Sequence, residues 1–594
     1  MIPRILFFTI SLLLPALRPD LSAADEKRPN LVFILIDDLG HLGISAYGSN
    51  KMGFVGGALD DVELSTPNID KLASRGLRCD RAFTAPLCEP TRIALMSGKY
   101  NHRNLVHKKS QHASDITFGD VFKRAGYVTG ITGKWKQSRG TKEIPAKDYL
   151  YEFGWEEFCC FDLVKQGNRF FNPDLVINGE IRKFDDGIDP ETGRRWFGPD
   201  ICNRFALNFI EKHKDEPFFL YYPLALVHKE DEGNYHVPTP DTYPLDEFDK
   251  FDDDFQSPKG NDKATLKNFP EMIRYTDKMV GNVIDKIDSL GLTENTLIVL
   301  MGDNGTQKPF IHVMPDGTRY QGRKGSATDH GMHVPLIFSQ PGTVPTGKDD
   351  QIRSYDGMVN LIDIYPTLCA AADINPPNAD EIDGINFWPQ ILGKAGEHRR
   401  ENFFYYEEPY FSEKDQKVVL RFAFDKKYKR YAPHPGFPKG RFFDIESDSI
   451  EESGNREVPA PHFNIIYHSG LELDKLTPEQ QAAFERLGKV IESNRFIPAT
   501  DVSIKSGDLA LAVGKSTRIS AEVLPADATI NNTIWESSNP GIVTIDKFGV
   551  VTAHKAGDTT ITLYSWQDAK PMANNLPVTY AKDGMSDSIS VKVR

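Results

Sequence analysis

The sequence is poor in cysteine and lacks the features that define several protein classes. Its 594 residues include six cysteines, none with paired zinc-type spacing, so a dense disulfide framework and a zinc module are both unexpected. Disulfide pairing stays open, because spacing does not reveal connectivity. The formal net charge is -14 and no long Lys/Arg run occurs, which argues against a nucleic-acid partner. An anionic substrate would therefore need a locally basic pocket.

Long apolar runs are also scarce. The one candidate, Ile5 to Leu17, follows Arg4 and precedes the small residues Ser22 to Ala24. This run is shorter than the ~20 apolar residues of a membrane-spanning helix, whereas its flanks are typical of a signal peptide. We therefore predict a signal peptide over residues 1–24, no transmembrane segment after its cleavage, and a secreted or periplasmic protein.

What the sequence does contain is alternation of apolar runs with helix-like segments, which predicts an α/β fold with a large mixed sheet flanked by helices. The expected strands are Leu31 to Ile36, Val128 to Thr132, Phe218 to Ala225, Thr296 to Met301 and Val334 to Phe338. The expected helices are Ile69 to Arg75, Thr91 to Met96, Phe205 to His213 and Met272 to Leu290. Ligands of open α/β sheets bind at the carboxyl ends of the strands.

Changes in composition divide the rest of the chain. We assign residues 25–400 to a catalytic α/β domain and 401–497 to a smaller α+β subdomain, with a strand at Val418 to Phe424 and a helix at Pro478 to Ser493. Short alternating strands then predict an all-β sandwich over 499–594. Its segment I-W-E-S-S-N-P from Ile534, with the following D-K-F-G-V-V-T-A and K-A-G-D-T-T-I-T, resembles the bacterial Ig-like domain of group 2.

Oxygen-rich pairs end two of the expected strands. Asp37-Asp38 follows the first and Asp303-Asn304 the fourth. Alone, each pair is more typical of a turn or a helix cap. Together they predict a site for calcium or magnesium, because hard cations prefer oxygen ligands.

Cys88 begins the segment C-E-P-T-R. Pro90 is placed to open a helix, which leaves Cys88 just outside its N-terminus, where free N–H groups favour an anion. Arg92 adds a fixed positive charge. By itself, a lone cysteine in this position is usually a small buried apolar residue.

Several ordered motifs resemble the sulfatase family, whose scaffold is alkaline-phosphatase-like. C-E-P-T-R followed by Ser97-Gly98 looks like the signature in which the cysteine is oxidised to formylglycine by a dedicated maturation enzyme. The flanking matches are Ile36 to Gly40, Thr66 to Asp70, Gly133-Lys134-Trp135, Gly302 to Gly305, and Lys324-Gly325 followed by Val334-Pro335. The resemblance covers roughly residues 29 to 395.

This resemblance implies roles for individual residues. Asp37, Asp38, Asp303 and Asn304 would hold one calcium ion together with the modified Cys88, whose hydrated aldehyde would attack sulfur. Arg92, Lys134 and Lys324 would neutralise the sulfate oxygens. His228 would protonate the leaving alcohol, helped by Lys324, since an imidazole titrates near working pH.

The chain departs from the family pattern at several positions. Lys136 stands where the family usually has a histidine, so it either takes the proton, with a pKa depressed by neighbouring cations, or binds sulfate or substrate. His330 and His333 replace smaller or basic residues, and the Lys51 to Leu64 connection is long. We place both on loops at the pocket rim, where they would tune substrate choice. Candidate substrate contacts are His102, Arg103 and His333, with His107, Arg139 and Arg323 as further polar loop residues.

The resemblance and the predicted export together indicate a secreted calcium-dependent sulfatase acting on a sulfated carbohydrate. Two alternatives stay open. One is a phosphodiester or phosphonate hydrolase on the same scaffold. The other is a catalytically silent protein that binds sulfated glycans, for which Lys136 is the main support. The Ig-like domain is either a spacer or a binding module.

Overall fold

The computed structural model describes most of the chain. The described residues are 28–104, 111–137, 144–163, 169–184, 187–230, 236–242, 263–349, 351–394, 400–407, 420–459, 466–565, 569–570, 579–580 and 584–594. The predicted signal peptide lies outside them, as do His107 and Arg139. Among the helices of the described part, none combines the length and the apolar character needed to cross a membrane.

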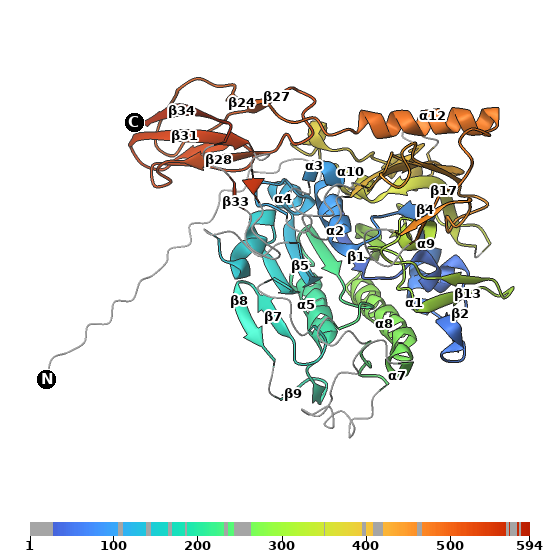
Figure 1. Ribbon diagram of the computed structural model, residues 1–594. Helices are drawn as coiled ribbons and strands as arrows, with labels where there is room; N and C mark the ends of the chain where they lie inside the picture. The colour runs from blue at the N-terminus through green and yellow to red at the C-terminus, as the bar shows by residue number, and fades with distance from the viewer. Residues whose placement is uncertain are drawn as a thin grey trace.

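An eleven-stranded mixed sheet forms the centre of the protein (Figure 1), which confirms the predicted fold class. Its order is β15-β4-β16-β12-β1-β11-β5-β6-β7-β8, with β17 also paired to β4. The strands are β1 Asn30–Ile36, β4 Gly76–Phe83, β5 Val128–Lys134, β6 Glu157–Phe161, β7 Asp174–Ile177, β8 Glu180–Lys183, β11 Phe218–Pro223, β12 Thr296–Gly302, β15 His333–Val334, β16 Leu336–Ser339 and β17 Arg353–Asn360. The strand expected over 334–338 is divided at Pro335, which has no N–H for strand pairing.

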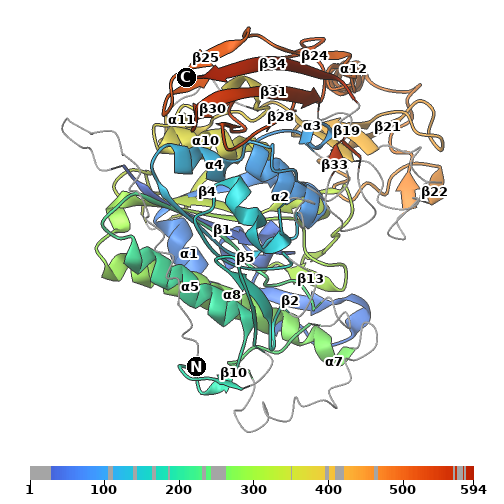
Figure 2. The same ribbon diagram turned by 90° about the vertical axis from the view of Figure 1, so that its left-hand side faces the viewer.

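Helices cover both faces of this sheet (Figure 2). The alternation of side chains along β1 sends Val32, Ile34 and Ile36 into one core, shared with α1 Pro67–Ser74, α5 Gly198–Lys212 and α8 Asn268–Ser289. Leu31, Phe33 and Leu35 enter the opposite core with α2 Cys88–Ser97, α4 Phe118–Arg124 and α10 Ile364–Ala371. Every residue of β1 is buried, as expected for a central strand between two helical layers.

The remaining short elements of this domain complete its surface. They are α3 Asn101–Asn104, α7 Lys263–Leu266, α9 Asp329–Met332, α11 Trp388–Ile391, β9 Ile188–Asp189 and β10 Arg194–Arg195.

All six cysteines are buried and carry free thiols, so the pairing left open by the sequence is absent.

The long connection between residues 51 and 64 contains strands, contrary to the loop expected there. β2 Lys51–Phe54 and β3 Val62–Glu63 join β13 Phe310–Val313 and β14 Arg319–Gln321 in a separate four-stranded sheet. Apolar Met52 and Phe54 alternate with polar or small residues, and both are buried. This alternation is a strand signal that the prediction of a loop overlooked.

Residues 403–493 form a smaller α+β unit. β18 Phe403–Glu407, β19 Leu420–Phe424, β20 Tyr428–Tyr431 and β21 Arg441–Asp444 make an antiparallel sheet, and β22 Glu457–Pro459 pairs with β23 Ile466–His468. Helix α12, Pro478–Ser493, begins with a capping box formed by Thr477 and Gln480. It packs Leu487 and Ile491 on one side of the sheet, while Phe403 and Phe424 contact Phe83 of the main domain on the other.

The last segment is all β, as predicted. Its strands are β24 Asp501–Ile504, β25 Leu509–Leu511, β26 Ser516–Arg518, β27 Ala521–Leu524, β28 Thr533–Ser537, β29 Val543–Ile545, β30 Val550–Ala553, β31 Gly557–Ser565, β32 Ala569–Lys570, β33 Thr579–Tyr580 and β34 Ser586–Val593. The neighbouring strands β26 and β27 belong to different sheets, since β26 pairs with β30 and β27 with β24. Their apolar core includes Val543, Val551, Ile561 and Val591.

This Ig-like module contacts the α/β domain through buried polar groups. The Lys547 ammonium donates to the carbonyl oxygens of Asp115 (2.8 Å) and Glu152 (2.5 Å) and to the Asp120 carboxylate (3.0 Å). The Asn532 amide donates to the Asp115 carboxylate at 2.7 Å. Burial raises the pKa of Asp115 to about 6. The module is therefore docked on the domain, and a freely tethered spacer is not what the structure shows.

We predict that Lys547→Ala loosens this contact. A hydrogen bond to a charged group contributes about 1.5–3 kcal/mol, so amide hydrogen exchange in residues 117–124 should accelerate by roughly tenfold or more. Lys555→Ala, an exposed lysine of the same module, is the matched control. Equal exchange in both variants would show that the Lys547 contacts do not hold the module in place.

Candidate functional site

The two oxygen-rich pairs, Asp37-Asp38 and Asp303-Asn304, meet at one edge of the central sheet. β1 and β12 are parallel neighbours in the register Ile36 to Gly302, so the residues that follow each strand emerge side by side. The Asp38 backbone N–H donates to the Asp303 carboxylate at 3.0 Å, and the Asn304 amide donates to Asp38 at 2.9 Å. All of these side chains are buried. The structure thus brings the four predicted oxygen donors together.

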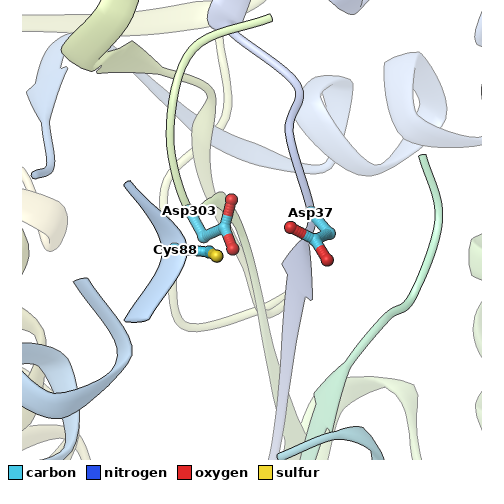
Figure 3. A group of neighbouring side chains, drawn as sticks. All are labelled: Asp37, Cys88 and Asp303. Atoms are coloured by element: carbon cyan, nitrogen blue, oxygen red, sulfur yellow. The ribbon is translucent and has the colours of Figure 1, made fainter. Parts of the chain in front are cut away.

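Cys88 faces this group from the start of α2 (Figure 3). Its sulfur and one carboxylate oxygen each of Asp37 and Asp303 lie within 4.8 Å of one another. The sequence predicted Cys88 just before the helix, but Cys88 is its first residue. Pro90 can lie in the first turn of a helix because N–H groups there have no intrahelical partner. The side chain still projects from a helix N-terminus, and it is 6% exposed.

Two buried cations neutralise the carboxylates. Arg92 Nη2 and Nε donate to Asp303 Oδ2 at 2.8 and 3.1 Å, and the Lys134 ammonium donates to Asp37 Oδ2. Lys134 is the last residue of β5. Gly133 before it has φ 119° and passes so close to β11 that an added Cβ would lie 2.0 Å from the Pro223 carbonyl oxygen. Only glycine fits this approach.

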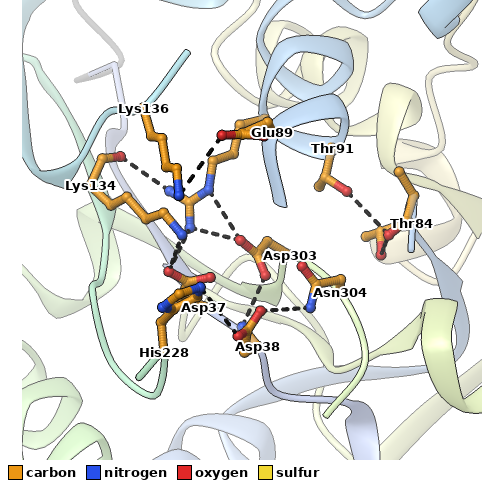
Figure 4. Close-up of polar contacts among 12 residues, drawn as sticks. Asp37, Asp38, Thr84, Glu89, Thr91, Lys134, Lys136, His228, Asp303 and Asn304 are labelled. Atoms are coloured by element: carbon orange, nitrogen blue, oxygen red, sulfur yellow. Dashed lines mark hydrogen bonds and ion pairs between the residues drawn. The ribbon is translucent and has the colours of Figure 1, made fainter. Parts of the chain in front are cut away.

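Lys324 and His228 reach the same group from two loops. Figure 4 shows His228 beside Asp37 and Asp38. Lys324 Nζ donates to Asp38 Oδ2 at 2.6 Å. Its loop is held by the Gly325 N–H, which donates to the Pro86 carbonyl oxygen just before α2. His228 follows a segment that exchanges backbone hydrogen bonds with Asp37, and its Nε2 lies 3.7 Å from Asp38 Oδ2.

Burial and charge act in opposite directions on these groups. Burial alone would raise the pKa of Asp37, but Lys134, Arg92 and Lys324 hold it below its usual range. The pKa of Asp303 is raised by burial and by the charge of Asp37. Burial and the nearby cations hold the pKa of His228 well below its ordinary value. The pocket is therefore suited to an anion, whose charge would favour the protonated imidazole.

The donor set also fits a hard cation. Asp37 Oδ1 and Asn304 Oδ1 are buried and accept no hydrogen bond from any residue that the structure describes. A buried oxygen without a donor is costly, and a bound divalent ion would satisfy both atoms. Carboxylate and amide oxygens are the ligands that calcium and magnesium prefer.

Lys136 lies beside the cluster. Its Nζ is 3.9 Å from Glu89 Oε1, and its backbone has φ 55°, a left-handed conformation that few non-glycine residues adopt. This turn aims the side chain from the end of β5 towards the start of α2 (Figure 4). The position agrees with contact to an anion at Cys88, and both predicted roles of Lys136 stay predictions.

The three residues predicted to contact the substrate make the following contacts with residues outside this cluster. The His102 ring packs on Tyr100 and Phe404. Arg103 pairs with Asp383 and donates to the Thr529 carbonyl oxygen of the Ig-like module at 3.4 Å. His333 stacks on His41 at 3.6 Å. Their role in substrate binding stays a prediction.

The sequence analysis did not predict two residues of the site, Gln307 and Arg169. Gln307 donates to Asp38 Oδ2 at 3.0 Å, and its position three residues after Asn304, in the same polar loop, was a usable signal. Arg169 is fully buried with Nη1 3.0 Å from His228 Nδ1. It lies 59 residues from His228 in a segment without a motif, so no sequence signal pointed to it.

Taken together, the buried cations, the oxygen donors and the side chain at a helix N-terminus define a site for hydrolysing an anionic ester at the edge of an α/β sheet. The sulfatase family model matches residues 29–374, and that of the bacterial Ig-like domain (group 2) matches 498–570. The chain belongs to the sulfatase family and is a sulfuric ester hydrolase.

Individual relatives agree with this assignment. An N-acetylgalactosamine-6-O-sulfatase of Bacteroides thetaiotaomicron is 26% identical over 448 residues, which cover 62% of this chain and 78% of the relative. Human arylsulfatase A is 26% identical over 422 residues, covering 67% and 74%. The crystal structure of Ps i-CgsB in complex with k-i-k-neocarrahexaose shares the fold, with a TM-score of 0.55, 22% identity, and coverage of 78% of this chain and 92% of that one.

We predict that Arg92→Gln destabilises the metal-free protein strongly. Removing one partner of a buried ion pair typically costs ~3–5 kcal/mol, because the remaining charge stays buried. Chemical denaturation in a chelating buffer measures the change. Arg319→Gln, which breaks an exposed bidentate pair with Asp61, should cost at most ~1 kcal/mol. A similar small loss in both variants would contradict the ion-pair account of the site.

Proposed function

We propose that this protein is an exported, calcium-dependent sulfatase that removes sulfate from a carbohydrate, with formylglycine made from Cys88 as its nucleophile. The observation that carries the proposal is the placement of Cys88 at a helix N-terminus, within 4.8 Å of two carboxylates and facing buried cations. A structural cysteine would need none of these charges. Recruitment of a formylglycine-generating enzyme is part of the proposal.

The chain's own groups suit a sulfate ester. Arg92 and Lys134 are fully buried, so they present fixed positive charge without water, which strengthens their attraction for an oxyanion. The Lys324 side chain is 19% exposed and lies at the pocket mouth. His228 Nε2 faces the same space and would hold the proton for the leaving oxygen. Lys136, from the opposite side, would contact the sulfate.

Asp37, Asp38, Asp303, Asn304 and the modified Cys88 would hold the calcium ion. When bound, the ion lowers the pKa of a coordinated hydroxyl and polarises the ester. The buried unpartnered oxygens of Asp37 and Asn304 support this assignment.

The carbohydrate part rests on the relatives. The N-acetylgalactosamine-6-O-sulfatase named above matches 62% of this chain, and its name gives an amino sugar sulfate as substrate. Export rests on the N-terminal sequence, and the domain limits 25–400, 401–497 and 499–594 are proposed with it. We propose that the Ig-like module stays docked on the catalytic domain, because Lys547 and Asn532 donate hydrogen bonds to Asp115.

We predict that peptide mass spectrometry finds Cys88 converted to the aldehyde when the protein is produced with a formylglycine-generating enzyme. This material should hydrolyse N-acetylgalactosamine 6-sulfate and an aryl sulfate, and Cys88→Ala should lose all measurable turnover. Cys79→Ala, another buried thiol, is the control that keeps activity. A preference for phosphodiesters over matched sulfates would favour the phosphoester hydrolase, and an unmodified, inactive Cys88 would favour the silent binder.

We also predict that calcium raises the thermal midpoint of the mature protein and that a chelator reverses the effect. A ligand at one hundred times its Kd adds about 2.7 kcal/mol of stability. Asp37→Asn should abolish the calcium-dependent shift, whereas Asp61→Asn, in an exposed ion pair, should retain it. An equal shift in both variants would place the calcium elsewhere.

A further inference from the structure

A second cavity lies next to the catalytic group. It has a volume of about 280 Å³ and is formed between the loop that carries Lys324 and the smaller α+β unit. Its lining includes Arg323, Gly325, Tyr431, Arg441, Tyr467 and His468. Arg323 and Gly325 are the direct chain neighbours of Lys324, whose ammonium contacts Asp38, so one loop contributes both to this cavity and to the acidic group.

Arg441 is the unusual member of this lining. It is the first residue of β21 and is 5% exposed. Its guanidinium lies over the rings of Tyr431 (3.8 Å to the centroid) and Tyr467 (4.4 Å). Its side chain donates from Nη1 to the His468 carbonyl oxygen at 3.5 Å, the outer limit of such a bond. Within the described ranges, no carboxylate forms an ion pair with it.

The neighbouring acids are already engaged. Glu451 accepts a hydrogen bond from Lys429 at 2.8 Å and another from the Tyr431 hydroxyl. Glu452 pairs with Arg323 at 2.6 Å. Among the described residues, Arg441 therefore has no carboxylate partner of its own.

A buried guanidinium without a counterion is costly, and the stacked rings offset only part of that cost. The rings contact the guanidinium through their π faces and accept no N–H hydrogen bond of ordinary strength, so its N–H groups can still donate to an anion. These N–H groups match the two oxygens of a carboxylate or a sulfate in bidentate geometry. The arrangement therefore presents a rigid cation towards a cavity large enough for part of a sugar.

We propose that this cavity is a second anion-binding subsite, in which Arg441 binds a carboxylate or sulfate group on the sugar adjacent to the one that loses its sulfate. The subsite rests on the proposed function and narrows it, because it makes the preferred substrate an oligosaccharide with at least two anionic groups. Arg441 acts in binding and touches no reacting atom.

The test compares matched disaccharides that carry the same 6-sulfated N-acetylgalactosamine. The neighbouring sugar bears a carboxylate, a sulfate ester, or no charge. With mature full-length protein, Arg441→Gln should lower kcat/KM about tenfold or more on the doubly anionic substrates, and less than twofold on the singly charged one. The larger of the two losses identifies which anion the subsite takes.

Two further variants keep the test decisive. Arg441→Lys retains the charge without the planar fork, so it should fold and show an intermediate loss. Arg182→Gln, an exposed arginine of β8, should match the wild type on every substrate. A loss in Arg441→Gln that is equal on all three disaccharides, or no loss on any, would overturn the proposal.

Failure of the proposed function would appear differently. If the wild-type protein hydrolyses no sulfate ester, calorimetry with the Cys88→Ala variant measures binding of the same disaccharides alone. Binding of the doubly anionic compounds that weakens tenfold on adding Arg441→Gln would support the subsite. Equal binding in the two variants would falsify it.

Discussion

The site depends on one buried ion cluster, in which Arg92 and Lys134 neutralise Asp303 and Asp37. All four side chains are fully buried, so none of the charges could persist without the others. The cluster joins helix α2 to the carboxyl ends of three strands, β1, β5 and β12. The ion pair between Arg92 and Asp303 also fixes the position of Cys88, because both Arg92 and Cys88 belong to α2.

The same cluster explains how a protein with net charge -14 presents a pocket for an anion. Arg92, Lys134 and Lys324 lie together at the carboxyl ends of the strands. Each forms an ion pair with a carboxylate of the site. The negative charge of a sulfate ester would offset part of the positive charge that a divalent cation brings, and both ions would redistribute these pairs. Lys324, at the mouth, connects this balance to the neighbouring cavity through Arg323 and Gly325.

The outer modules extend the catalytic unit in different ways. The smaller α+β unit contributes Arg441 and aromatic rings to a cavity beside the sulfate site. The Ig-like module contacts the layer of helices that contains α2 and α4, where Lys547 and Asn532 bond to the 115–120 segment. The module also accepts a hydrogen bond from Arg103 through the Thr529 carbonyl oxygen, and its role as a spacer or a binding module stays a prediction.

The sequence by itself determined the sheet, its helices and the meeting of the two acidic pairs, because buried parallel strands are near-continuous apolar runs and their polar ends share an edge. It did not determine the strands at 51–63, the partners of His102, Arg103 and His333, or the contacts of Arg169 and Arg441. These depend on packing between segments up to hundreds of residues apart, such as Arg103 with Thr529. Only the tertiary structure fixes which charges are paired, because pairing is a property of distance in space and leaves no periodic signal along the chain.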